Sequence, residues 1–153
     1  MNMRTLLLMA SLCAAWPAAL QAGEHDCSVA TLHGSFGFTF TGTARTSTGV
    51  SQRGGIGRYD IDGLGNLVGA ITSNADGVVL RRPLVGLYTV DADCTGSFAV
   101  DFTDAIGGHA TFDMVIDDDG TEFRTVSTPP SGAVNPPTLT AVARRQFSHR
   151  ENK

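Results

Sequence analysis

The stretch that decides the fold is Gly86-Leu87-Tyr88-Thr89-Val90-Asp91-Ala92-Asp93-Cys94-Thr95-Gly96, an alternating segment that runs into a turn. Successive side chains of a strand point to opposite sides, so Gly86, Tyr88 and Val90 share one face. The turn that follows carries Cys94, one of few cysteines in the chain. The stretch therefore predicts a β-strand that ends at a corner held by a cysteine.

The first residues predict export. Arg4, the apolar residues 6–16 and small residues ending at Ala22 form the three parts of a secretory signal peptide, residues 1–22. Its removal from the 153-residue chain leaves 131 residues, enough for one domain with a core. We expect this domain, a β-barrel domain, to span residues 23–147 and a disordered tail to span residues 148–153. The predicted localisation is secreted or periplasmic.

Two cysteines remain once Cys13 leaves with the signal peptide: Cys27 and Cys94. In an exported chain an isolated pair is most simply a disulfide. A metal site built from His25, Asp26 and Cys27 is the alternative, but three adjacent residues converge poorly on one ion. We therefore expect a disulfide between Cys27 and Cys94, and no metal.

Charge and hydropathy limit the partners. The formal net charge is −4, and loss of Arg4 with the signal peptide makes it −5, which disfavours nucleic acid. Past the signal peptide no apolar run approaches the ~20 residues of a membrane-spanning helix. We expect a soluble chain with no membrane span and no cofactor; the sequence leaves the oligomeric state open.

Short alternating segments separated by turn residues fill the remainder of the chain. The expected strands cover residues 35–44, 57–62, 67–73, 78–82, 84–90, 97–102, 110–117, 122–127 and 138–145. Residues 45–56, rich in Ser, Thr and Gly, are expected to be flexible, with Gly54, Gly55 and Gly57 at a bulge or bend. Pro83 cannot donate to a ladder and is expected at an edge, a bulge or a break.

These eight or nine antiparallel strands have no helix to cover a sheet face, and open sheet edges invite aggregation. Closure removes the edges. The predicted fold class is therefore all-β, a single antiparallel up-and-down β-barrel of about eight strands, with a two-sheet β-sandwich as the alternative.

The order of the turn, glycine and cysteine motifs resembles a known family. The motifs are Cys27-Ser28, Leu32-x-Gly34-x-Phe36-Gly37-Phe38, Asp62-Gly63-x-Gly65-Asn66-x-x-Gly69, Gly86-x-Tyr88-x-Val90-x-x-Asp93-Cys94-Thr95-Gly96 and Ala143-Arg144-Arg145-Gln146. They resemble small secreted bacterial proteins related to the allene-oxide-cyclase type of calycin-like barrel. This resemblance implies an apolar lumen that hosts either ligand binding or the cyclisation of unsaturated lipids and polyketides. No catalytic residue of the family matches a position here, so enzymatic activity is left open.

An inward-facing set of large side chains would line such a lumen. As ligand-binding candidates we take Phe36, Phe38, Phe40, Tyr59, Tyr88, Phe98, Phe112 and Met114. The hydroxyls of Tyr59 and Tyr88 are the expected polar contacts. The pattern does not decide whether these side chains fill the interior or surround a cavity.

Two other sets of residues can be interpreted either as chemical sites or as parts of the structure. His109 and Asp113 share a strand face and could act as an acid/base pair, but the apolar face of that strand is expected to look inward and leave both solvated. The acidic turns at Asp62 and at residues 117–119 resemble calcium loops but lack their full spacing, so we interpret them as turns.

The sequence thus favours a secreted β-barrel that binds a small apolar ligand in its lumen or has a structural role in the envelope. A cyclase or isomerase acting on an unsaturated lipid or polyketide is the first alternative, and a protein-interaction module is the second.

Overall fold

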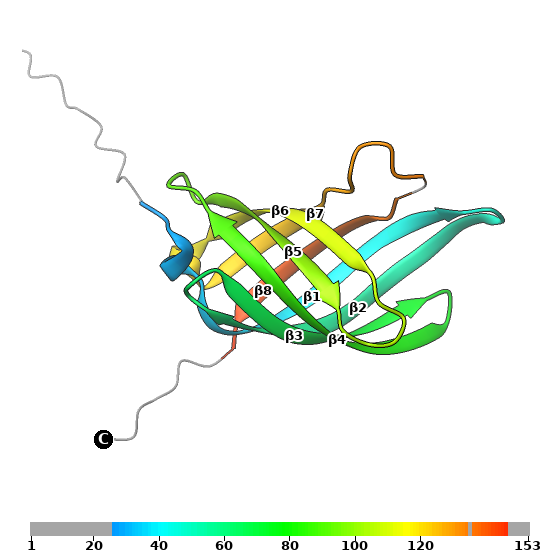
Figure 1. Cartoon of the computed structure of the whole chain (residues 1–153), viewed down its shortest axis with the longest axis horizontal. Coiled ribbons are helices and arrows are strands. Elements are labelled where there is room, and N and C mark those ends of the chain that lie inside the picture. The colour runs from blue at the N-terminus through cyan, green and yellow to red at the C-terminus, as the bar shows by residue number, and fades with distance from the viewer. Residues whose placement is uncertain (1–25, 135, 147–153) are drawn as a thin grey trace, which may run out of the picture.

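The structure is a computed structural model that describes residues 26–134 and 136–146 (Figure 1). The predicted signal peptide and the predicted tail lie outside the described residues. Eight antiparallel strands close into one barrel in which each strand pairs with the next along the chain and β8 pairs with β1. The predicted up-and-down barrel is confirmed, and the sandwich alternative is wrong.

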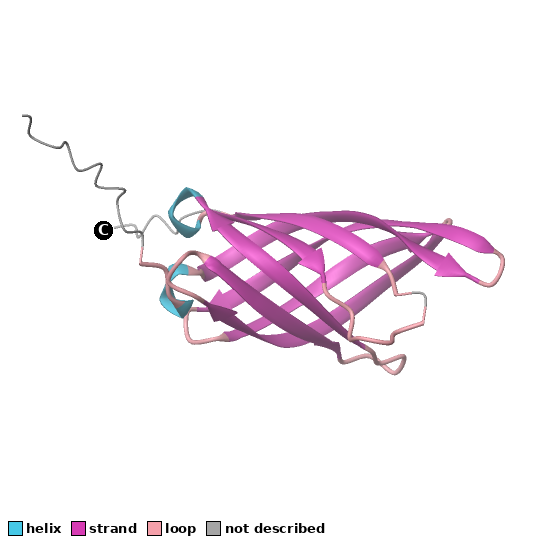
Figure 2. Ribbon diagram, turned by 90° about the horizontal axis from the view of Figure 1, so that it is seen from above, coloured by secondary structure: helices cyan, strands magenta, loops and turns pink. Residues whose placement is uncertain are grey.

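The elements follow one another with short connections. In chain order they are η1 (Val29–Thr31), β1 (His33–Thr46), β2 (Gly49–Asp62), β3 (Asn66–Ala75), β4 (Val78–Val90), β5 (Thr95–Phe102), β6 (His109–Asp117), η2 (Asp118–Gly120), β7 (Glu122–Ser127) and β8 (Thr138–Arg145). Figure 2 shows the tilted strands wrapping around one axis. Tilt of this kind allows eight strands to close around a narrow interior.

The segment expected to be flexible, residues 45–56, is instead part of a long hairpin. β1 and β2 pair without interruption from His33↔Asp62 to Thr46↔Gly49, so there is no bulge at the glycines. A Cβ atom at Gly57 would overlap the ring of Phe38, and one at Gly55 would overlap the ring of Phe40. The prediction failed because these glycines leave room for aromatic rings on the neighbouring strand, a function that composition alone does not indicate.

Pro83 lies inside one continuous strand, so the count is eight strands rather than nine. It pairs with Ala70 of β3, whereas the pairing of β4 with β5 starts one residue later, at Leu84. Pro83, which lacks an N–H group, therefore lies just beyond the end of the β4–β5 ladder, and the closed, continuous sheet has none of the edge, bulge or break that were expected there. Its carbonyl oxygen accepts a hydrogen bond from the Thr103 amide at 3.1 Å.

One end of the barrel is covered by the start of the described chain (Figure 1). A disulfide between Cys27 and Cys94 joins this segment to the turn after β4, with the two Cα atoms 5.0 Å apart. The predicted disulfide is present. The amide of Cys27 also donates to the Ala92 carbonyl at 3.2 Å, so η1 is held across what we call the closed end.

Candidate ligand-binding site

The interior of the barrel is divided into a filled half and an open half. Side chains alternate as predicted: Phe36, Phe38, Phe98 and Met114 are buried, whereas neighbours such as Thr39 are exposed. The filled half lies at the closed end and the open half at the end where β1 and β2 are joined. The position of the cavity is therefore set by the point along the barrel axis at which large inward-facing side chains are replaced by smaller ones.

The filled half leaves almost no space. Leu32 and Phe36 are the most deeply buried large side chains, and a void of only about 10 Å³ remains among their neighbours. The Tyr88 hydroxyl lies 2.8 Å from the Val29 carbonyl oxygen and 3.0 Å from that of Leu32, and it donates to these oxygens. Tyr88 thus fixes the segment that covers the closed end.

The open half contains a cavity of about 340 Å³. This volume falls in the range of small-molecule sites in proteins. Its walls combine aromatic rings with small side chains such as Ala110 and Ala141, which leave the space that larger residues fill at the closed end. The exposed residues of its lining include the apolar Val78 and Leu80 as well as the polar Arg53, Asn74 and His109.

Two stacked ring pairs form part of the wall. The rings of Phe38 and Tyr59 lie 4.1 Å apart between centroids with an interplanar angle of 10°, and those of Phe98 and Phe112 lie 4.7 Å apart at 14°. Tyr59 also meets Phe98 edge to face at 6.0 Å. Contacts of these kinds are the preferred arrangements of aromatic rings and give the cavity firm, flat surfaces.

Arg82 is fixed at the cavity by several contacts. Its guanidinium donates to both carboxylate oxygens of Asp104 at 2.7 Å and to the Gly107 carbonyl oxygen, and it lies 4.0 Å above the ring centroid of Phe102. The hydrogen bond from Arg82 lowers the pKa of the Asp104 carboxyl group. Bidentate pairing of this sort holds a side chain in one orientation, so Arg82 shapes the wall.

Among the largely buried residues of the cavity, Thr125 and Tyr59 carry hydroxyl groups with no hydrogen-bond partner in the described part of the chain. The Thr125 Oγ1 atom is buried and unpaired, and Thr125 is 7 % exposed. Tyr59 is 6 % exposed, takes part in no hydrogen bond among the described residues, and has its phenol pKa raised by burial alone. Sequence patterns could place Tyr59 on the inner face, but no motif marks Thr125.

The eight candidate residues divide between the two halves. Phe38, Phe40, Tyr59, Phe98 and Phe112 line the open cavity, which brings five of them together. The other three, Phe36, Tyr88 and Met114, belong to the packed core at the closed end. The Tyr88 hydroxyl was expected to contact a ligand, but it hydrogen-bonds to the segment that covers the closed end.

The His109 and Asp113 pair is not assembled as an acid/base site. His109 pairs with Asp101 on the neighbouring strand, with Nδ1 2.7 Å from the carboxylate, and both groups are more than half exposed. Asp113 is exposed too. His109 reaches the rim of the cavity, but the described residues that line the cavity include no carboxylate.

The acidic turn at Asp62 serves local structure. The Asp62 carboxylate accepts from the Leu64 amide at 2.7 Å, the Asn66 amide at 3.0 Å and the Asn66 side-chain amide at 2.7 Å. These bonds lower the pKa of Asp62, with the Asn66 side chain contributing most. Within residues 26–134 and 136–146 no three His, Cys, Asp or Glu side chains are grouped to hold a metal ion.

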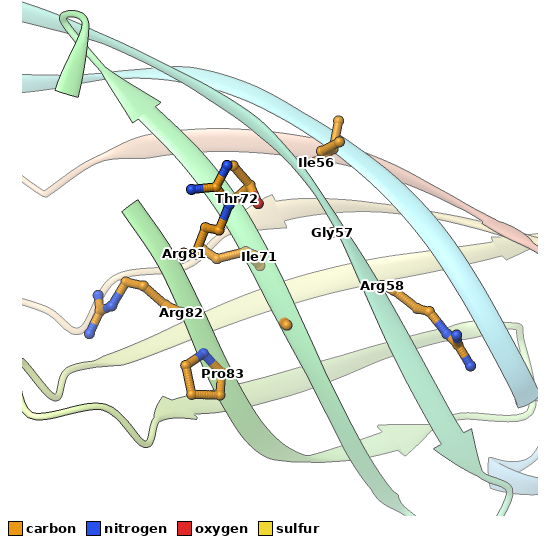
Figure 3. A pocket seen from close by; sticks show the side chains of 9 residues that line it. Ile56, Gly57, Arg58, Ile71, Thr72, Arg81, Arg82 and Pro83 are labelled. Carbon is orange, nitrogen blue, oxygen red and sulfur yellow. The ribbon is translucent and has the colours of Figure 1, made fainter. Parts of the chain in front are cut away.

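A second hollow, of about 420 Å³, lies on the outer surface of β2, β3 and β4 (Figure 3). Ile56, Arg58, Thr72, Arg81 and Pro83 surround it, and no aromatic ring does. It is larger than the inner cavity but much more open to solvent, a depression rather than an enclosure. We therefore take the lumen as the candidate site.

Comparison with known proteins places the chain by fold. No protein-family model and no curated protein matches the sequence. Two redesigned β-barrels are similar in structure. One, mFAP1 bound to DFHBI, is 19 % identical with a TM-score of 0.51 and covers 76 % of this chain and 97 % of its own. The other, b11L5F_LGL, is 19 % identical with a TM-score of 0.50 and covers 78 % and 95 %. This likeness shows the eight-stranded barrel fold.

Two observations bear on compartment. The Cys27–Cys94 disulfide is consistent with an oxidising environment. None of the helices in the described residues is long and apolar enough to cross a membrane.

Proposed function

We propose that this barrel binds a small, mostly apolar molecule in the open half of its lumen, and that it does so as a secreted or periplasmic protein. The observation that carries the proposal is the cavity of about 340 Å³ walled by Phe38, Phe40, Tyr59, Phe98 and Phe112. A lumen with only a structural purpose gains stability from filling, as the closed end does, because empty space in a core costs dispersion contacts. Retained space beside aromatic walls therefore favours a ligand.

Two further points support the proposal. The redesigned barrel mFAP1, which is similar in fold, was solved with DFHBI bound, so a barrel of this size can take up a small molecule. The resemblance to the allene-oxide-cyclase type of barrel leads to the same kind of ligand, an apolar molecule held by shape. Of the two activities that this resemblance implies, binding is favoured over cyclisation because the described lining offers no carboxylate.

A pair of matched variants tests the site. Ala141→Phe adds a ring to the lumen, whereas Thr140→Phe adds the same ring one residue away on the outer face of β8. We expect the fluorescence of 1-anilinonaphthalene-8-sulfonate to rise on the wild-type protein and on Thr140→Phe, and to stay at the level of free dye on Ala141→Phe. Equal enhancement on all three folded proteins would place the dye outside the lumen and contradict the proposal.

Native mass spectrometry offers an independent test without a chosen probe. Protein exported by a bacterial host and purified without organic solvent should retain a molecule of a few hundred daltons that Ala141→Phe lacks. A wild-type protein that carries no such mass and does not take up the dye would leave the proposal without support.

A further inference from the structure

The hydroxyls of Thr125 and Tyr59, which have no hydrogen-bond partner among the described residues, indicate the class of ligand that the cavity can bind. Thr125 lies two residues beyond Phe123 on β7, and both side chains point inward, so its hydroxyl lies just above the filled half. Tyr59 lines the cavity and also borders the small void of the filled half. Both residues therefore border the floor of the cavity, among apolar side chains.

Leaving the buried Thr125 hydroxyl unpaired is costly. A buried hydroxyl without a partner forfeits the hydrogen bonds that it makes to water in the unfolded chain, and most buried polar groups in proteins are satisfied. Tyr88 shows the usual solution in this same barrel, because its hydroxyl donates to the carbonyl oxygens of Val29 and Leu32. Valine would fill the position of Thr125 without this cost.

The chemistry of the two groups decides what they can bind. Burial raises the pKa of the Tyr59 phenol, so it keeps its proton at neutral pH and acts as a hydrogen-bond donor. A threonine hydroxyl donates one hydrogen bond and accepts others. An oxygen with free lone pairs, such as a carbonyl oxygen, can satisfy either group; a hydrocarbon can satisfy neither.

We propose that the lumen selects flat, mostly apolar molecules that carry a hydrogen-bond-accepting oxygen, which enters first and meets the hydroxyls of Tyr59 and Thr125 at the floor. This inference rests on the proposed function and names its ligand class. The stacked rings of Phe38 with Tyr59 and of Phe98 with Phe112 supply flat walls for the apolar part. Specificity then comes from the two donors, as in other apolar sites with few polar groups.

Two probes of equal shape test the proposal. 2-Acetylnaphthalene carries a carbonyl group, and 2-isopropenylnaphthalene has a methylene group in place of that oxygen. Each is titrated against the exported wild-type protein, Tyr59→Phe, Thr125→Val and Tyr88→Phe. We expect Tyr59→Phe to lower the affinity for 2-acetylnaphthalene about three- to tenfold, which corresponds to the loss of one hydrogen bond. The affinity for 2-isopropenylnaphthalene should change less than about twofold. Thr125→Val should act in the same direction.

Tyr88→Phe is the matched control, because it removes a phenol hydroxyl that already has partners in the protein. It should leave the affinity of both probes unchanged and lower the melting temperature of the free protein. Tyr59→Phe and Thr125→Val should leave that melting temperature unchanged or raise it, since each removes an unpaired group. These melts give a readout that does not depend on any ligand.

The outcomes separate the two proposals. If both probes bind and neither Tyr59→Phe nor Thr125→Val affects the ketone selectively, the ligand class is wrong and the ligand-binding function stands. If neither probe binds the folded wild-type protein, both proposals fail. A loss of stability in Tyr59→Phe as large as that in Tyr88→Phe would show that the Tyr59 hydroxyl is already satisfied, and would overturn the inference.

Discussion

Replacement of both cysteines, Cys27→Ala with Cys94→Ala, should cost this barrel roughly 4 kcal/mol of unfolding free energy. The two residues are 67 positions apart in sequence. In the chain-entropy model a crosslink closing a loop of that length removes about 15 cal/mol/K from the unfolded chain, which is about 4 kcal/mol at 25 °C. For a domain of this size each kcal/mol shifts the melting temperature by about 4 °C, so the expected drop is about 16 °C.

The assay is thermal unfolding followed by far-ultraviolet circular dichroism, on chains that begin at residue 23 and so lack Cys13. Wild-type protein melted with excess dithiothreitol should approach the melting temperature of the double variant, and the double variant should not respond to the reductant. The Cys27 amide would still have the Ala92 carbonyl as a partner, so the barrel should remain folded at 25 °C. A drop below about 3 °C in both comparisons would refute the assignment of a stabilising role to this bond.

Three further expectations concern the core, a glycine and the mouth. Leu32→Ala should destabilise the barrel by about 2–5 kcal/mol in urea unfolding, because Leu32 is 1 % exposed at the closed end; a loss below about 1 kcal/mol would contradict that packing. Gly57→Ala should lower stability and weaken dye binding together, because the new Cβ atom would displace the ring of Phe38; unchanged binding would argue against it. Asp104→Asn should be less stable than wild type at pH 7, because Arg82 pairs with the Asp104 carboxylate and lowers its pKa in the folded state. The difference should shrink as the pH falls below about 4, where the unfolded chain takes up the proton first. A gap in melting temperature that does not narrow at all below about pH 4 would count against this pairing.

Much of the architecture could be predicted from alternation alone. The inward placement of Phe36, Phe38 and Phe40 on one strand, and of Phe98 on another, follows from the two-residue period of a strand, which holds regardless of neighbours. Closure followed from the need to remove sheet edges. The disulfide followed from the presence of two cysteines in the chain after the predicted signal peptide.

The division of the lumen was harder to predict because it depends on how strands are staggered. Phe36 and Phe40 lie on the same face of the same strand, yet one is in the packed half and the other borders the cavity. Only the register places Phe40 of β1 directly beside Ala141 of β8, so that a large and a small residue are neighbours in the cavity wall. Thr125 is the clearest case, since its lack of a partner is a property of its surroundings.

The ring of Phe98 belongs to both halves of the interior: it stacks on Phe112 beside the cavity and meets Phe123 edge to face at 6.4 Å in the packed core. A ligand that contacts this ring from the cavity would therefore contact a side chain that also belongs to the packed core. A ligand that binds only the folded chain adds about 2.7 kcal/mol to the unfolding free energy at one hundred times the dissociation constant, and the melting temperature therefore rises with ligand concentration. Thermal unfolding in the presence of compound libraries therefore tests the proposed ligand binding and identifies any compound that binds the folded chain.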